Sequence, residues 1–202
     1  MGAELLPWVF TSGWASGINS YAVVLVMGLL GRFGQVEAIP QALTRTDVLV
    51  AATVLFLIEM VADKIPYVDS TWDAIHTVVR PTIGATLGYL LGNETSSLDA
   101  ALWAAAGGFS AFASHAVKAG LRMAVNTSPE PASNFAVSTA EDATVVGVVS
   151  LAAVYPWAAA SVAAALLVIG VALVLFLLGR IRRFRRGYGR WNERADLKNP
   201  AP

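Results

Sequence analysis

Long apolar stretches, separated by short polar ones, dominate the sequence. Six apolar segments can be distinguished, over residues 8–30, 48–62, 73–92, 100–118, 143–155 and 158–178. A helix needs about 20 mainly apolar residues to cross a bilayer, so the second and fifth segments are short for a span. The pattern predicts an all-α integral membrane protein with about six transmembrane helices.

The second half of the chain resembles the first when it is shifted by about 95 residues. Ser16 and Ser20 then fall on Ser110 and Ser114. Each half holds three segments, and because three is odd, the second half would lie inverted in the membrane. Inverted repeats of this kind occur in secondary transporters, whose sites lie at the repeat interface. The predicted division is into two inverted three-helix repeats and a basic cytoplasmic tail, at residues 1–95, 96–179 and 180–202.

Composition agrees with the membrane class. The chain is 56% hydrophobic and only 14% charged, with a mean hydropathy of +0.60, whereas soluble domains carry roughly 25% charged residues. It contains no cysteine, which excludes a disulfide framework and a thiol nucleophile. We expect no cofactor. We also expect no nucleic-acid partner, because the basic tail follows directly on a membrane helix.

Lysine and arginine set the expected orientation, since cytoplasmic loops carry an excess of both. The run from Arg180 to Arg186 predicts a cytoplasmic C-terminus that binds anionic lipid headgroups. With six spans the N-terminus would be cytoplasmic as well. The expected location is a bacterial plasma (inner) membrane, with the lipid bilayer as the main partner. Association into a homo-oligomer stays open.

Charged residues within the apolar segments are the candidates for chemistry, because intramembrane charges are costly and need partners or a task. Glu59 and Asp63 are four residues apart and share one helical face, and Asp73, His76 and Arg80 share a face of the next helix. Carboxylates with a histidine are typical of intramembrane proton relays. An ion-paired clamp between two helices explains Asp63, Lys64, Asp69 and Asp73 equally well. Glu59 and Arg80 sit deeper, and for them a functional role is favoured.

A second group follows in the other half of the chain. His115, Lys118 and Arg122 lie on one helical face, and we expect Lys118 and Arg122 to act as positive-inside anchors. Asn126 to Glu130 form a polar loop. Glu141 and Asp142 are expected to cap a helix N-terminus. The candidate binding residues for a substrate or ion are Glu59, Asp63, Lys64, Asp69, Asp73, His76, Arg80, His115, Lys118, Arg122, Asn126 and Glu130.

The function favoured by these observations is secondary transport of a small solute, an ion or a lipid-linked molecule. Two alternatives stay open. One is a membrane-embedded enzyme that acts on a lipid headgroup with a metal held by Asp63, Asp69 and Asp73. The other is a non-catalytic assembly partner whose charges only clamp helices. Common catalytic motifs, such as a Gly-x-Ser-x-Gly elbow or His-Glu-x-x-His, are absent, so we do not expect an enzyme.

Two motifs resemble a known family. The first runs from Glu59 through Asp63-Lys64-Ile-Pro to Arg80-Pro81, and the second from His115 through Asn126-Thr-Ser-Pro-Glu-Pro to Glu141-Asp142. With these residues the chain resembles the uncharacterised bacterial membrane family catalogued as domain of unknown function 4126, over most of residues 10–178. The resemblance implies a multi-helix inner-membrane protein and supplies no activity.

Overall fold

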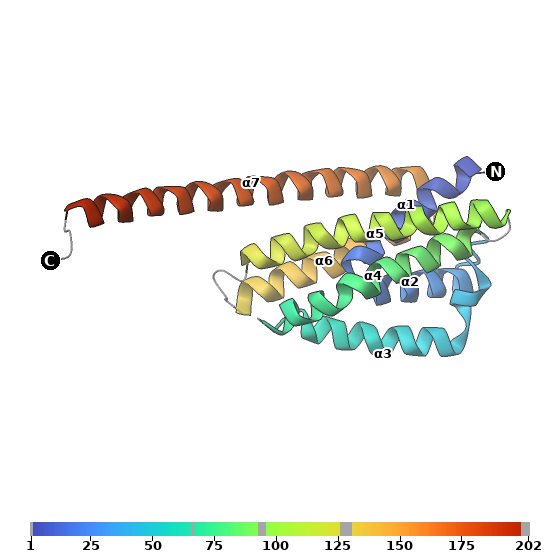
Figure 1. The fold of residues 1–202 in the computed structure, drawn as a ribbon. Coiled ribbons are helices and arrows are strands. Elements are labelled where there is room, and N and C mark those ends of the chain that lie inside the picture. Colours follow the sequence, from blue (N-terminus) through green and yellow to red (C-terminus); the bar gives the residue numbers. More distant parts are fainter. Residues whose placement is uncertain (1, 66, 93–95, 126–130, 199–202) are drawn as a thin grey trace.

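The computed structural model describes residues 2–65, 67–92, 96–125 and 131–198. In this part of the chain it contains seven α-helices, one short 3₁₀ helix and no strand, which confirms the all-α prediction. Figure 1 shows the helices gathered into one elongated bundle, past which the end of α7 extends. The elements are α1 (Gly2–Ile18), α2 (Ser20–Phe33), η1 (Gln41–Thr44), α3 (Thr46–Ala62), α4 (Val68–Gly92), α5 (Ser97–Val125), α6 (Pro131–Ala152) and α7 (Pro156–Lys198).

Several helices are longer than the apolar segments that predicted them. The helix expected from residue 73 begins at Val68 and contains Pro81. The described part of the chain between the predicted segments 100–118 and 143–155 is helical as well, because α5 continues to Val125 and α6 begins at Pro131. Proline is favoured in the first turn of a helix, where its missing N–H has no partner to lose. Both Pro131 and Pro156 therefore start helices instead of separating them.

The first predicted span, residues 8–30, is broken into two helices at Asn19. This residue has extended backbone angles (φ −147°, ψ 98°) between the helical residues on either side. Its side-chain oxygen accepts a hydrogen bond from the backbone N–H of Ala22 at 2.9 Å. Asn19 is thus the N-cap of α2, a position that asparagine fills well.

The two helices joined at Asn19 fold back on each other. The carbonyl of Ile18, at the end of α1, accepts a hydrogen bond from Lys118, which also pairs with Asp63 just after α3. Arg32, near the end of α2, donates to Thr46 at the start of α3. Because α1 ends beside one end of α3 and α2 ends beside the other, the pair forms a hairpin. We call it the α1–α2 hairpin.

This hairpin changes the expected topology. The first segment leaves the bundle at the end where it entered, whereas the five helices α3 to α7 run along the bundle in alternating directions (Figure 1). The N-terminus and the end of α7 therefore lie at opposite ends (Figure 1). The prediction that both termini are cytoplasmic counted residues 8–30 as one crossing, and the hairpin gives that prediction no support.

Helices α1 and α5 run in the same direction. Side chains of Ser110, Ser114 and Lys118 donate to the carbonyls of residues 10, 14 and 18, at distances of 3.1, 2.7 and 2.9 Å. The constant separation of 100 residues in these pairs requires parallel helices. Inversion would run these two corresponding helices in opposite directions, so this contact does not support it. The division at residues 95 and 96 into two repeats stays a sequence prediction.

Glycines bring three backbones into contact at the centre of the bundle. A Cβ on Gly13 of α1 would lie 2.6 Å from the carbonyl oxygen of Gly107 on α5, and a Cβ on Gly84 of α4 would lie 2.7 Å from the same oxygen. Small residues allow such close helix approach. The contact fixes α1, α4 and α5 as the frame around which polar side chains converge.

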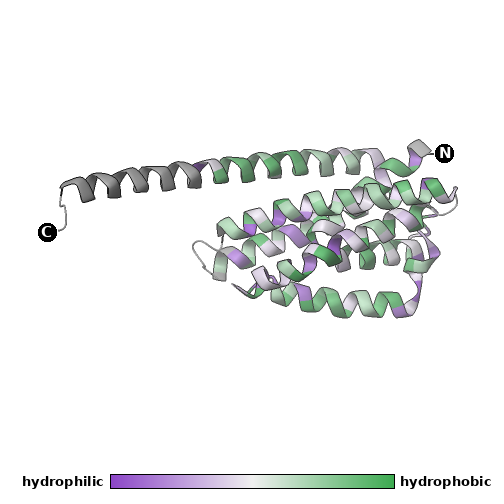
Figure 2. Ribbon diagram, viewed as in Figure 1, coloured by the Kyte–Doolittle hydropathy of each residue, from purple (hydrophilic) through white to green (hydrophobic). Residues whose placement is uncertain are grey.

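The exterior of the bundle is apolar. Figure 2 shows apolar residues along α3 and along the described part of α7. The exposed large hydrophobic side chains of α3 are Val50, Val54, Leu57, Ile58 and Val61. Among the described residues, two stretches are long and apolar enough to cross a membrane, Asn134–Ala152 of α6 and Pro156–Arg180 of α7.

Candidate functional site: a buried charged cluster

The interior of the bundle contains a network of ion pairs between four cations and six carboxylates. They come from α3, α4, α5, α6 and the short link after α3. We call this network the charged cluster. Its cations are Lys64, Arg80, Lys118 and Arg122, and its carboxylates are Glu59, Asp63, Asp69, Asp73, Glu141 and Asp142.

Arg80 is the centre of the first part of the cluster. Its Nη2 donates to Glu59 Oε1 at 2.7 Å, and its Nη1 lies 2.9 Å from Asp73 Oδ1 and 2.8 Å from His115 Nδ1. A guanidinium can only donate, so Nδ1 of His115 is the acceptor and Nε2 carries the ring proton. That Nε2 lies 3.1 Å from the hydroxyl oxygen of Thr77. The arrangement assigns His115 one neutral tautomer.

Lys118 and Arg122 form the second part. They lie about one and two helical turns beyond His115 on α5. Lys118 Nζ lies 2.5 Å from Asp63 Oδ2 and donates to the Ile18 carbonyl at 2.9 Å. Arg122 donates through Nη2 to Glu141 Oε2 at 2.7 Å and through Nη1 to the Asp63 carbonyl at 2.8 Å. This part joins α5 to the end of α3 and to the middle of α6.

The third part joins Lys64 and the apex of the α1–α2 hairpin to α6. Lys64 Nζ lies 3.7 Å from Asp142 Oδ2 and 3.2 Å from the Ser138 hydroxyl. The amide of Asn19 donates to Asp142 Oδ1 at 2.9 Å. Asp142 therefore holds both a lysine and the residue at which α1 and α2 are broken.

At the break, each helix end faces side chains whose charge is opposite to the partial charge of that end. The last carbonyls of α1 point toward cations, with Gly17 O at 3.4 Å from Arg80 Nη1 and Ile18 O at 2.9 Å from Lys118 Nζ. A helix C-terminus carries partial negative charge and an N-terminus partial positive charge. The first turn of α2 correspondingly begins beside the Asp142 carboxylate.

The cluster carries more negative than positive charge. Among the described side chains its carboxylates exceed its cations by two, the histidines not being counted. Two buried carboxylate oxygens, Glu59 Oε2 and Asp63 Oδ1, accept no hydrogen bond from the part of the chain that the structure describes. A buried carboxylate that is not compensated is costly and tends to take up a proton or a cation. The cluster is therefore suited to receive positive charge.

The sequence candidates mostly converge in this cluster. His76 lies at its edge, where Nδ1 donates to the Trp72 carbonyl at 2.8 Å and Nε2 lies 3.2 Å from the Tyr21 hydroxyl. Asn126 and Glu130 lie outside the described residues. The other candidates, Glu59, Asp63, Lys64, Asp69, Asp73, Arg80, His115, Lys118 and Arg122, are joined by the pairs given above or by Arg122 Nη1 to Asp69 Oδ2 at 3.7 Å.

Three expectations about individual residues were wrong or incomplete. Lys118 and Arg122 are not interfacial anchors, because they are only 3% and 1% exposed. Glu141 and Asp142 do not cap α6, which begins ten residues earlier at Pro131. Asn19 was not singled out, although an asparagine that precedes a serine within a Gly-rich apolar stretch is a typical N-cap signal.

The carboxylates proposed for an enzyme's metal are separated by cations. Asp63 pairs with Lys118, Asp69 faces Arg122, and Asp73 pairs with Arg80. Across the described part of the chain, no three His, Asp or Glu side chains are grouped to hold one metal ion. The arrangement gives the metal-dependent alternative no support.

The fold and the cluster define a class of protein, an all-helical bundle with an apolar exterior and a charged interior. The chain belongs to the family described as domain of unknown function DUF4126, whose model matches residues 6–175. This confirms the family that the two motifs indicated, and the match includes the whole charged cluster. Comparison with curated proteins found no match, and comparison with solved structures found none.

Proposed function

We propose that this protein is integral to a membrane and that α3 to α7 cross it. The support is the distribution of polarity, with apolar side chains outside and ion pairs inside. Large exposed apolar surfaces are unfavourable in water. The α1–α2 hairpin would enter the membrane without crossing it. Backbone breaks at membrane depth are tolerated where they are buried in protein, and Asn19 is fully buried.

The proposed depth of the cluster follows from α7. Gly170 lies against Val117, so the middle of the apolar stretch Pro156–Arg180 is level with the cluster residues of α5. The cluster would then lie near the centre of the bilayer. The arginines from Arg180 to Arg186 favour a cytoplasmic end of α7 with anionic lipid headgroups around it. The N-terminus would lie on the opposite side.

We propose secondary transport of a small solute, coupled to protons, as the function. One observation carries the proposal. A helix broken at Asn19 directs its two ends at a buried cluster that has two more carboxylates than cations. Discontinuous helices whose ends face ions and substrates are the usual sites of secondary transporters. Intramembrane carboxylates of this kind also serve proton relays.

The coupling follows from charge balance. The excess of two negative charges is neutralised either by protons or by a positively charged solute, so the two compete for the same carboxylates. Glu59 and Asp63 are the proposed proton carriers, because each has a buried oxygen without a hydrogen-bond donor. Glu59 lies in the last turn of α3 and Asp63 at its C-cap, beside Arg80 and Lys118 respectively.

Everted membrane vesicles from cells that express the chain test this function. Respiration acidifies the vesicles, and acridine orange reports the pH gradient while K⁺, amino acids, sugars and amines are added in separate pools. We expect at least one pool to dissipate the pH gradient in wild-type vesicles. In Glu59→Gln vesicles the same pool should dissipate the gradient about tenfold less. Asp47→Asn, which changes an exposed carboxylate on the same helix, is the control. Equal responses in wild type and Glu59→Gln would contradict the proposal.

A further inference from the structure

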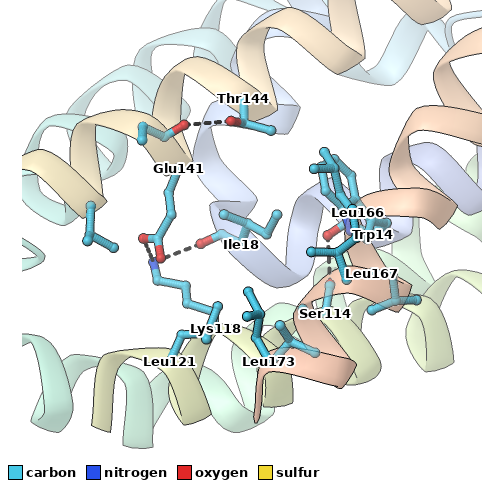
Figure 3. A pocket seen from close by; sticks show the side chains of 15 residues that line it. Trp14, Ile18, Ser114, Lys118, Leu121, Glu141, Thr144, Leu166, Leu167 and Leu173 are labelled. Atoms are coloured by element: carbon cyan, nitrogen blue, oxygen red, sulfur yellow. Dashed lines mark hydrogen bonds and ion pairs between the residues drawn. The ribbon is translucent and has the colours of Figure 1, made fainter. Parts of the chain in front are cut away.

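A second feature is an apolar pocket of about 330 Å³ between α1, α5, α6 and α7. Figure 3 shows Lys118 and Glu141 together at one side of it, and Trp14 and Leu166 away from them at the other. Its wall is otherwise almost entirely apolar. The pocket therefore has a charged end, which belongs to the cluster, and an apolar body.

The charged end offers a carboxylate acceptor beside a lysine whose charge is already paired. Lys118 Nζ donates to Asp63 Oδ2 and to the Ile18 carbonyl, and it forms an ion pair with Glu141 Oε2 at 3.6 Å, beyond hydrogen-bond distance. Glu141 uses the same Oε2 for Arg122. Its Oε1 accepts no hydrogen bond from the described residues, and the side chain is 16% exposed. A ligand that reaches this end meets a free carboxylate oxygen.

The local charge also favours a cation. Lys118 and Arg122 are the positive groups at this end, and they face three carboxylates, Asp63, Asp69 and Glu141. Counted among the described side chains, the carboxylates at this end exceed the cations by one, and one bound positive charge would balance them. An anion would add to the excess.

The mouth of the pocket lies on the apolar exterior. Three lining residues of α7, Leu166, Ile169 and Leu173, are 37%, 55% and 47% exposed. They belong to the surface that the proposed function assigns to lipid. Pockets for small molecules range from about 300 to 1,000 Å³, so this one suits a compact ligand.

We propose that this pocket binds a hydrophobic organic cation, an amine or ammonium compound with a compact apolar body. The charge lies at Glu141 and the body lies among α5, α6 and α7. The inference rests on the proposed function and names its substrate class. The bound cation supplies the positive charge that protons supply in its absence, which makes the exchange one of cation for proton.

Two ions of nearly equal shape and opposite charge test the assignment. Equilibrium dialysis of the purified protein in neutral detergent measures binding of tetraphenylphosphonium and of tetraphenylborate. We expect saturable binding of the phosphonium and none of the borate above the level in protein-free micelles. Glu141→Gln should weaken phosphonium binding at least tenfold.

A second pair of variants guards against loss of folding in Glu141→Gln. Ala140→Trp should block binding, because Ala140 lines the pocket. Ala143→Trp, on an exposed position of the same helix that does not line it, should leave binding within twofold of wild type. Stronger binding of the borate, or unchanged phosphonium binding in both Glu141→Gln and Ala140→Trp, overturns the inference.

The outcome is separable from that of the vesicle experiment. Phosphonium binding without dissipation of the pH gradient by any pool would contradict transport and leave the binding site standing. Dissipation by a pool without amines, together with no phosphonium binding, would contradict the cation site and leave transport standing.

Discussion

Arg80 Nη2 lies 2.7 Å from Glu59 Oε1, and both side chains are completely buried. The pair joins α4 to α3 at a depth where neither group meets solvent. Removing one partner of a buried ion pair leaves an uncompensated charge, which costs more than the pair itself contributes.

Replacing Arg80 with methionine should therefore be strongly destabilising. Glu59 and Asp73 would both lose their cation, and we expect a loss of about 3–5 kcal/mol in the free energy of unfolding. Thermal or denaturant unfolding in detergent measures it. The double variant Glu59→Leu with Arg80→Met should lose less than Arg80→Met alone.

The control for this prediction is Arg45, whose ion pair with Asp47 at 2.7 Å is exposed. Arg45→Met should leave the melting temperature almost unchanged, since exposed pairs contribute little. Equal melting temperatures for Arg80→Met and Arg45→Met would show that the buried pair does not contribute to stability.

Gly17 and Gly147 should respond in opposite ways to substitution by alanine. A Cβ on Gly17 would overlap the Ser114 hydroxyl and lie 2.8 Å from the backbone nitrogen of His115, so we expect a loss of roughly 1–3 kcal/mol. A Cβ on Gly147 meets no atom within 4 Å. Alanine there should add roughly 0.5–1 kcal/mol, because glycine is unfavourable inside a helix. Unfolding of the two variants side by side checks both signs.

Asn19 has two roles that substitution can separate. Asn19→Ser keeps an N-cap oxygen but is too short for Asp142, and Asn19→Ala loses both contacts. We expect Asn19→Ala to be less stable than Asn19→Ser by about 0.5–2 kcal/mol, the usual contribution of a cap. The step from wild type to Asn19→Ser should cost about 1.5–3 kcal/mol through the bond to the carboxylate. Equal stability of the two variants would contradict the cap.

The topology can be tested with single cysteines, because the chain has none of its own. Glu4 and Ile65 are exposed residues at opposite ends of the bundle. We expect an impermeant maleimide to label Glu4→Cys in intact cells and Ile65→Cys only after permeabilisation. Labelling of both positions only after permeabilisation would instead favour six crossings.

The sequence alone predicted the charged residues well and their partners poorly. Helical spacing placed Asp73 and Arg80 on one face, and they do pair. Spacing could not show that Lys118 and Arg122 reach across to α3 and α6, because pairing between helices depends on how closely the backbones approach. That approach is set by Gly13, Gly84 and Gly107, which in the sequence look like any other small residues.

The break at Asn19 was hidden for a different reason. Residues 8–30 are apolar throughout, and an average over such a stretch is insensitive to one polar residue. Similarly, the polar residues between the segments that end at 118 and begin at 143 suggested a loop, although Arg122, Ser138 and Glu141 lie within α5 and α6 and contact the cluster. Polar sequence usually indicates solvent exposure, whereas Arg122 and Ser138 of this bundle are buried.

The contact between α1 and α5 repeats at a four-residue step, with donors at Ser110, Ser114 and Lys118. A displacement of α1 by one helical turn along α5 would bring Ser114 and Lys118 to the carbonyls of residues 10 and 14, with no loss of bond type. These three hydrogen bonds therefore fix the relative direction of the two helices, but by themselves they are compatible with more than one register. Register is decided by other contacts. A one-turn displacement would bring Val9 against Gly107, where a Cβ has no room beside the carbonyl oxygen. At the apex, Asn19 meets Asp142 and Lys118 is also held by Asp63.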